Sequence, residues 1–205
     1  MMKNRQIILL CACAALLGWA LPAAAASPHM RDGWQLGFAY GYSSGRLTLA
    51  DGAEGEVRGG ATPQIRLGHA VGRHFAFGAE YNGWMLEGGD AALKIRSSLQ
   101  QVMLTGTWYP GNPQSISGGF YLRAGLGLGW ASVAEVEIVD QIQEHGVRID
   151  ESGLGIATSL GYEFRIRSNA AAGLGVGFNH LSINKDVYES GWFTPITGTL
   201  AWYWN

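Results

Sequence analysis

Two side chains near the carboxyl end of the chain have the types and spacing of an acyl-transfer pair. His180 and Ser182 lie two positions apart, so they share one face of an extended strand, and Glu189 follows in or near the next loop. A serine activated by a histidine, with a carboxylate that orients the ring, is the arrangement that cleaves acyl esters. The use of this chemistry depends on the elements that carry the three residues.

The segment 120–132 has the clearest pattern in the chain. Every second residue is apolar and mostly large, whereas the residues between them are mostly small and include one arginine. The first set is Phe120, Leu122, Ala124, Leu126, Leu128 and Trp130, and the second is Tyr121, Arg123, Gly125, Gly127, Gly129 and Ala131. This alternation predicts a transmembrane barrel strand, with lipid on the apolar face and a narrow polar lumen on the other. A soluble, lipocalin-like barrel is the alternative, and it requires a large apolar inward face.

Residues 1–26 have the organisation of a secretory signal peptide. Lys3 and Arg5 begin it, an apolar run follows at 7–21, and alanines at 24–26 form a cleavage site, which predicts a mature chain from Ser27. A lipoprotein is the alternative, because residues 10–13 resemble a lipobox that ends at Cys13. Both cysteines lie in this leader, so the mature chain has no thiol for a disulfide or a metal.

The rest of the chain predicts a short tail at 27–32 and one outer-membrane β-barrel at 33–205. The sequence has 14 Lys and Arg and 16 Asp and Glu. Without Lys3 and Arg5, the mature chain has 12 basic and 16 acidic residues, a net charge of −4. This acidic balance predicts no nucleic-acid partner. Eight segments alternate in strand fashion: 33–43, 62–72, 75–82, 94–109, 120–138, 154–164, 173–178 and 192–204. We expect loops at 45–61, 88–90, 140–147 and 185–191, and tight turns at 72–74 and 167–169.

Eight antiparallel strands form the smallest closed barrel that spans a membrane. Because bacterial barrels have short periplasmic turns and longer outer loops, we expect both chain ends in the periplasm. The runs GGFYLRAGLGLGW (118–130), GYEFRIRSN (161–169) and GLGVGF (173–178) resemble the outer-membrane β-barrel domain family, the small OmpA/OmpX-like barrels. The resemblance covers the whole mature chain and implies a porin-like fold in the bacterial outer membrane.

Four charged residues have the parity of lumen residues: Arg66, Glu80, Arg123 and Glu163. An eight-stranded barrel is just wide enough for side chains to fill its interior. Opposite charges in such a lumen pair with one another, because an unpaired buried charge is strongly destabilising. We therefore predict an ion network that plugs the lumen, with Arg123 paired to Glu80 or Glu163. A narrow pore is the alternative.

The His180–Ser182 pair and Glu189 are also similar to the lipid A deacylases, outer-membrane barrels with a His-x-Ser pair and a downstream glutamate. That resemblance implies His180 as the base, Ser182 as the nucleophile and Glu189 as the residue that orients the base. In the family an asparagine directly follows the serine, whereas here Ile183 follows it, Asn184 comes one later, and the glutamate lies closer. We therefore predict rim residues and no enzyme, with a lipid A 3-O-deacylase-like esterase as the alternative.

The predicted role is structural or one of surface interaction. Five tryptophans at strand ends suit interfacial girdles: Trp34, Trp130, Trp192, Trp202 and Trp204. The expected partners are outer-membrane lipid and lipopolysaccharide, the barrel assembly machinery through the C-terminal strand, and an extracellular ligand through acidic loops. The loop acids are Asp51, Glu54, Glu56, Glu87, Asp90, Asp140 and Glu144. No cofactor is expected, and the histidines and acids show no metal-site spacing.

Overall fold

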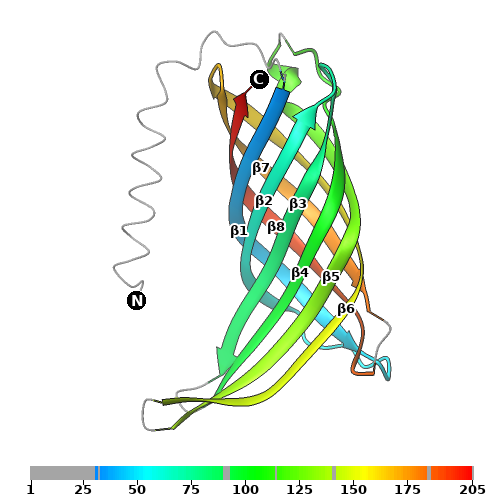
Figure 1. The fold of residues 1–205 in the computed structure, drawn as a ribbon, viewed down its shortest axis with the longest axis vertical. Coiled ribbons are helices and arrows are strands. Elements are labelled where there is room, and N and C mark those ends of the chain that lie inside the picture. Colours follow the sequence, from blue (N-terminus) through cyan, green and yellow to red (C-terminus); the bar gives the residue numbers. More distant parts are fainter. Residues whose placement is uncertain are drawn as a thin grey trace.

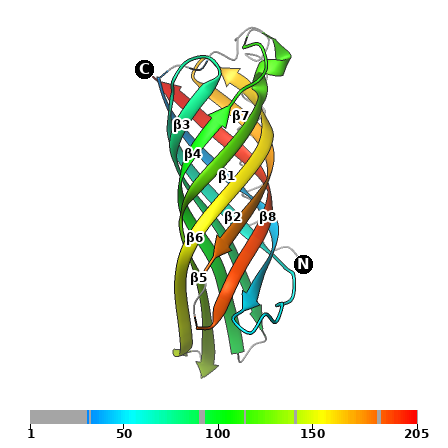
Figure 2. The same ribbon diagram turned by 90° about the vertical axis from the view of Figure 1, so that its right-hand side faces the viewer.

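The computed structural model describes residue 31 and residues 33–89, 93–113, 115–139, 142–183 and 186–204, which form a closed barrel of eight antiparallel strands (Figures 1 and 2). Each strand pairs with the next in sequence, and β1 pairs with β8. The strands are β1 (Gly33–Leu49), β2 (Arg58–Ala70), β3 (Phe75–Gly89), β4 (Leu93–Trp108), β5 (Phe120–Val139), β6 (Ile142–Arg167), β7 (Ala170–Ser182) and β8 (Tyr188–Trp204). The signal peptide and most of the expected tail lie outside the described residues.

Closure is made by a long, regular register between the first and last strands. Trp34 faces Trp204 at one end of this seam, and pairing continues to Leu49 opposite Tyr188 at the other. A closed ring leaves no strand edge unpaired in the hydrocarbon region, where water cannot satisfy the backbone. We name the end that holds Trp34 and Trp204 the terminal end, and the opposite end the far end.

The inward and outward faces follow the predicted parity. On β5 the apolar series from Phe120 to Leu128 is exposed, whereas Tyr121, Arg123 and Gly129 are buried in the interior. The same alternation continues through β7, where Leu174, Val176 and Phe178 face outward. The predicted fold class, an eight-stranded antiparallel barrel, is therefore confirmed.

The strands are longer than the sequence predicted at the far end. β1 continues to Leu49 and β6 begins at Ile142, so much of two expected loops is paired strand. β5 and β6 stay paired as far as Val139 opposite Ile142, whereas the pairing of β6 with β7 begins only at Leu154. The hairpins of β3–β4 and β5–β6 therefore project past the rest of the barrel (Figure 1). Lipid-type alternation stops at the bilayer surface although backbone pairing does not, which is why these extensions were interpreted as loops.

The connections at the terminal end are two tight turns, at 71–74 and 168–169, and a longer segment at 109–119. The turn between β2 and β3 places Gly72 at a φ of 113°, in the left-handed region that favours glycine. In the same turn, the carbonyl of His74 accepts a hydrogen bond from the amide of Tyr109 at 2.8 Å. A short 3-10 helix, η2 (Ile116–Gly119), follows before β5. Among the described residues, no helix has the length and hydropathy needed to cross a bilayer.

We predict that charge is tolerated far worse on the outer wall than beyond it. Leu126 is 63% exposed and lies in the middle of the outward series of β5. Leu126→Arg should lower the free energy of unfolding by about 2–4 kcal/mol, because a cation at the bilayer midplane loses its hydration. Urea titration of the barrel in lipid vesicles measures this loss.

The matched control is Val57→Arg in the connection between β1 and β2, where the side chain is also exposed. It should change stability by less than about 0.5 kcal/mol, as surface changes usually do. Equal losses at both positions would contradict the lipid-facing assignment.

Candidate functional site

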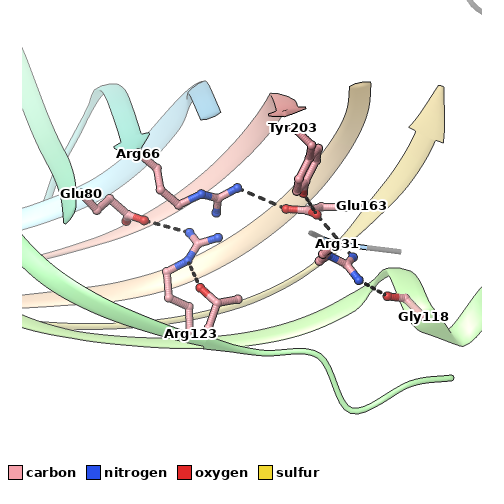
Figure 3. A network of polar contacts seen from close by, with 8 residues as sticks. Arg31, Arg66, Glu80, Gly118, Arg123, Glu163 and Tyr203 are labelled. Carbon is pink, nitrogen blue, oxygen red and sulfur yellow. Dashed lines mark hydrogen bonds and ion pairs between the residues drawn. The ribbon is translucent and has the colours of Figure 1, made fainter. Parts of the chain in front are cut away.

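A buried carboxylate, Glu163 on β6, is the centre of a network at the terminal end of the lumen (Figure 3). One of its oxygens accepts a hydrogen bond from Arg66 at 3.2 Å, and the other accepts one from the Tyr203 hydroxyl at 2.6 Å. Arg31 lies 3.4 Å from the second oxygen. Glu163 is 1% exposed, so this carboxylate receives from three side chains the hydrogen bonds that water would otherwise give.

Arg31 enters this network from the segment expected to be a short tail. Its Nη1 donates to the carbonyl of Gly118 at 2.9 Å, and its guanidinium lies 3.4 Å from the centre of the Tyr109 ring. Burial raises the pKa of the Tyr109 hydroxyl, so the ring beneath the guanidinium stays neutral. A cation over an aromatic face is attracted by the ring quadrupole. The expected tail therefore contributes to the interior at Arg31.

A second ion pair lies deeper in the lumen. Arg123 on β5 is 3.0 Å from the Glu80 carboxylate on β3, and its Nε donates to the Thr107 hydroxyl at 3.1 Å (Figure 3). Both charged side chains are buried. The four charged residues singled out in the sequence all point into the lumen, and they form two separate pairs. Arg66 faces Glu80 in the strand register, yet its ion pair reaches across the lumen to Glu163.

Beside this second pair the lumen is lined by polar residues. Two small cavities there have volumes of about 20 and 10 Å³. The larger is lined by residues such as Asn82, Thr105, Ser159 and Asn179, and the Asn82 amide donates to Asn179 at 3.2 Å. A cavity of this size holds about one water molecule.

The far third of the lumen differs from the sequence-based expectation of small and polar inward residues. There the interior is a cluster of buried, mostly large apolar side chains: Trp84, Leu99, Ala131, Leu181, Ile183, Tyr188 and Phe193. We name this cluster the apolar layer. Packing is close, because a Cβ placed on Gly191 would lie 2.9 Å from Leu99. The expectation was wrong here because it rested on the small inward residues of segments such as 120–132. Of the layer residues, Tyr188 lies in an expected loop, whereas Leu99 and Phe193 lie in predicted strands.

The residues of the acyl-transfer hypothesis lie on the outer wall. His180 and Ser182 are at the far end of β7, opposite Trp192 and Ser190 of β8, and Glu189 is exposed. No side-chain hydrogen bond or ion pair joins the three within the described part of the chain. The His180 backbone carbonyl accepts a hydrogen bond from Gln101 at 3.0 Å. Asn184 lies outside the described residues.

The five predicted girdle tryptophans lie at the two ends of the outward surface. Trp34, Trp202 and Trp204 are exposed at the terminal end, with Trp34 edge-on to His69 at 5.1 Å. Trp192 stacks on Phe178 at 6.5 Å towards the far end, where Trp130 also lies. Their depth in a membrane stays a prediction.

Several of the expected loop acids are paired with arginines at the far end. The ion pairs are Arg46–Glu54, Arg58–Glu56 and Arg96–Glu87. Asp90 and Asp140 lie outside the described residues. Within the described ranges, no group of three or more His, Cys, Asp or Glu side chains is placed to hold a metal ion.

The outer membrane protein beta-barrel domain model matches residues 11–202 of the chain. The chain belongs to this family. Its predicted location, the bacterial outer membrane, is therefore confirmed. A search of curated proteins found no match.

The fold is similar to that of Ail, the attachment invasion locus protein of Yersinia pestis. One Ail structure, in complex with the heparin analogue sucrose octasulfate, has a TM-score of 0.55 at 10% identity, covering 82% of this chain and 99% of that one. A second Ail structure has a TM-score of 0.50 at 13% identity, again covering 82% of this chain and 99% of that one. Neisserial surface protein A has a TM-score of 0.46 at 12% identity, covering 84% of this chain and 98% of that one. At these identities the likeness is one of fold.

We predict strong coupling between Arg123 and Glu80. Removing either charge should lower the free energy of unfolding by about 3–5 kcal/mol, because the partner stays buried and unpaired, and the double variant Arg123→Leu/Glu80→Leu should recover part of the loss. Denaturant titration of the four proteins measures the coupling.

The exposed pair Arg96–Glu87, on the neighbouring strands β4 and β3 at 2.7 Å, is the matched control. Its coupling should be about 0–1 kcal/mol, because water screens it. Additive losses at Arg123 and Glu80 would show that the buried charges do not interact.

We also predict that Ser182→Ala leaves the lipid A of an expressing strain unchanged. Mass spectrometry of extracted lipid A, with an empty-vector strain for comparison, measures the acyl-chain count. Loss of one acyl chain with the native protein, and its restoration by Ser182→Ala, would establish the esterase instead.

Proposed function

We propose that this barrel is a structural or surface-interaction protein of the outer membrane whose lumen is closed to solutes. The observation that carries the proposal is the sequence of layers along the lumen. The Glu163 network occupies the terminal end, the Arg123–Glu80 pair lies deeper, and the apolar layer fills the far third. An ion that crosses would have to separate buried ion pairs and then pass a dry region, and both steps are costly.

The orientation follows from the same architecture. The terminal end, where β1 begins and β8 ends, faces the periplasm, and the far end, where the hairpins project, faces the exterior. The projecting hairpins of β3–β4 and β5–β6 then present paired strands above the membrane (Figure 2). The fold resembles Ail, whose name describes attachment and which was crystallised with a sulfated sugar. We propose that the hairpins contact an extracellular ligand.

The apolar outward face of the barrel and its last strand indicate two further kinds of partner. Outer-membrane lipid and lipopolysaccharide surround the apolar outward face. The barrel assembly machinery recognises the last strand, β8, whose outward residues Trp202 and Trp204 form an aromatic C-terminal edge.

Planar-bilayer recording separates this proposal from the pore. The folded protein should give no current above that of a protein-free bilayer. Trp84→Ala/Phe193→Ala, which removes two large buried side chains from the apolar layer, should leave the ion pairs intact and give at most rare, brief openings. A steady conductance in the unmodified protein, with the heat-dependent gel shift of a folded barrel verified, would contradict the closed lumen.

A further inference from the structure

The seam between β1 and β8 is the one strand pairing of the ring that no turn or loop supports. Every other pair of neighbouring strands is consecutive in the chain, so a connection joins its two members. At the terminal end of the seam β1 begins and β8 ends, with Trp34 opposite Trp204 and Gln35 opposite Tyr203. Strand ends of this kind fray unless other contacts hold them. A side chain that binds both sides of the seam would supply such a contact.

One oxygen of Glu163 contacts both sides of this seam (Figure 3). Its Oε2 atom accepts a hydrogen bond from the Tyr203 hydroxyl of β8 at 2.6 Å, and it lies 3.4 Å from Arg31, two residues before β1. A hydroxyl that donates to a carboxylate at this distance makes a strong, charge-assisted hydrogen bond. Gly33, the first residue of β1, has a φ of 72°, in the left-handed region that favours glycine. The chain can therefore bend at Gly33 and place Arg31 inside the lumen.

Further contacts of β6 strengthen both sides. The Oε1 atom of Glu163 accepts a hydrogen bond from Arg66 at 3.2 Å, and the Arg66 guanidinium packs against β1, where a Cβ on Gly37 would lie 3.2 Å from its Nη2. On the β8 side, the guanidinium of Arg165 lies 3.8 Å from the centre of the Tyr203 ring. Although β6 pairs with neither seam strand, its side chains thus reach both of them across the lumen.

The second buried carboxylate of the lumen provides a comparison. Glu80 on β3 pairs with Arg123 on β5, so its ion pair joins two strands that lie away from the seam. Glu163 and Glu80 are alike in being buried and in having an arginine partner. They differ in that Glu163 contacts residues on both sides of the seam.

We propose that Glu163 holds the ring of strands closed at the terminal end of the β1–β8 seam. One oxygen binds the segment before β1 and the end of β8, so the set of bonds is complete only when both are docked. Loss of this carboxylate removes the group that the two sides share, and the seam then opens first at its terminal end while the other strands stay paired. The inference concerns the closure of the ring, and it does not rest on the proposed closure of the lumen to solutes.

Residue-resolved amide hydrogen exchange, measured by NMR on the folded protein in detergent micelles, tests this role. The readout is the mean exchange rate of residues 34–37 and 201–204, at the terminal end of the seam, divided by that of residues 39–42 and 196–199, farther along the same seam. Glu163→Gln, which removes the charge and keeps the size, should raise this ratio at least tenfold. A change in global stability alone speeds exchange in both sets and leaves the ratio unchanged.

Glu80→Gln is the matched control, because it makes the same substitution at the buried carboxylate whose ion pair joins β3 to β5. Its ratio should stay within twofold of that of the unmodified protein, even where exchange is faster in every strand. An equal rise of the ratio in Glu80→Gln and Glu163→Gln would overturn the proposal, as would an unchanged ratio in Glu163→Gln.

Tyr203→Phe tests the β8 side without removing a charge. It should raise the ratio at least threefold, and its addition to Glu163→Gln should change the ratio less than twofold further, because both substitutions remove the same bond. The heat-dependent gel shift establishes that each variant is folded. If Glu163→Gln does not fold, Tyr203→Phe decides the question, and an unchanged ratio there would overturn the proposal. None of these rates depends on conductance, so failure here is distinguishable from failure of the closed lumen.

Discussion

In the hydrocarbon region every backbone amide and carbonyl has to be paired within the protein, and the rest of this structure depends on that constraint. Eight strands satisfy it only by closing, and closure at eight strands gives an interior as wide as a side chain. Because the interior is so narrow, its side chains are crowded. A Cβ on Gly127 would lie 2.1 Å from the Val102 carbonyl, and one on Gly161 would lie 2.5 Å from the Tyr121 hydroxyl. The small residues opposite the lipid-facing series therefore leave room for the few large side chains inside.

The same narrowness determines how charges are arranged. Glu163 contacts Arg31 from before β1, Arg66 from β2 and Tyr203 from β8, so its contacts join both sides of the β1–β8 seam, at its terminal end, to β6. Such a carboxylate is stabilised only when all its partners are present, because each missing one leaves a buried charge less compensated. The seam that closes the barrel and the network that fills its terminal end thus depend on one another.

Alternation within the bilayer was sufficient to predict the strand class and the inward parity of Arg66, Glu80, Arg123 and Glu163. It limited the partner of Arg123 to Glu80 or Glu163, and the structure pairs Arg123 with Glu80. It did not predict the partner of Arg66, because Arg66 reaches across the ring to Glu163 and passes over its register neighbour Glu80. Arg31 was missed because it precedes the first strand and has no parity. Tyr203 was recoverable, since it lies between the outward residues Trp202 and Trp204. Trp84 of the apolar layer was missed because it lies past the end of the predicted strand 75–82. Phe193 was recoverable, since it lies inside the predicted strand 192–204, next to the outward residue Trp192.

Thiol labelling tests the closed lumen most directly, because both cysteines of the chain lie in the predicted leader and a single new one is easily followed. Ser159→Cys places a thiol beside the larger lumen cavity, between the Glu163 network and the apolar layer, and Leu49→Cys places one at the exposed far end of β1. With a small, charged, membrane-impermeant thiol reagent, the folded barrel should be labelled within minutes at Leu49→Cys and only after unfolding at Ser159→Cys. Labelling of the folded protein at similar rates in the two variants would contradict a lumen closed at both ends.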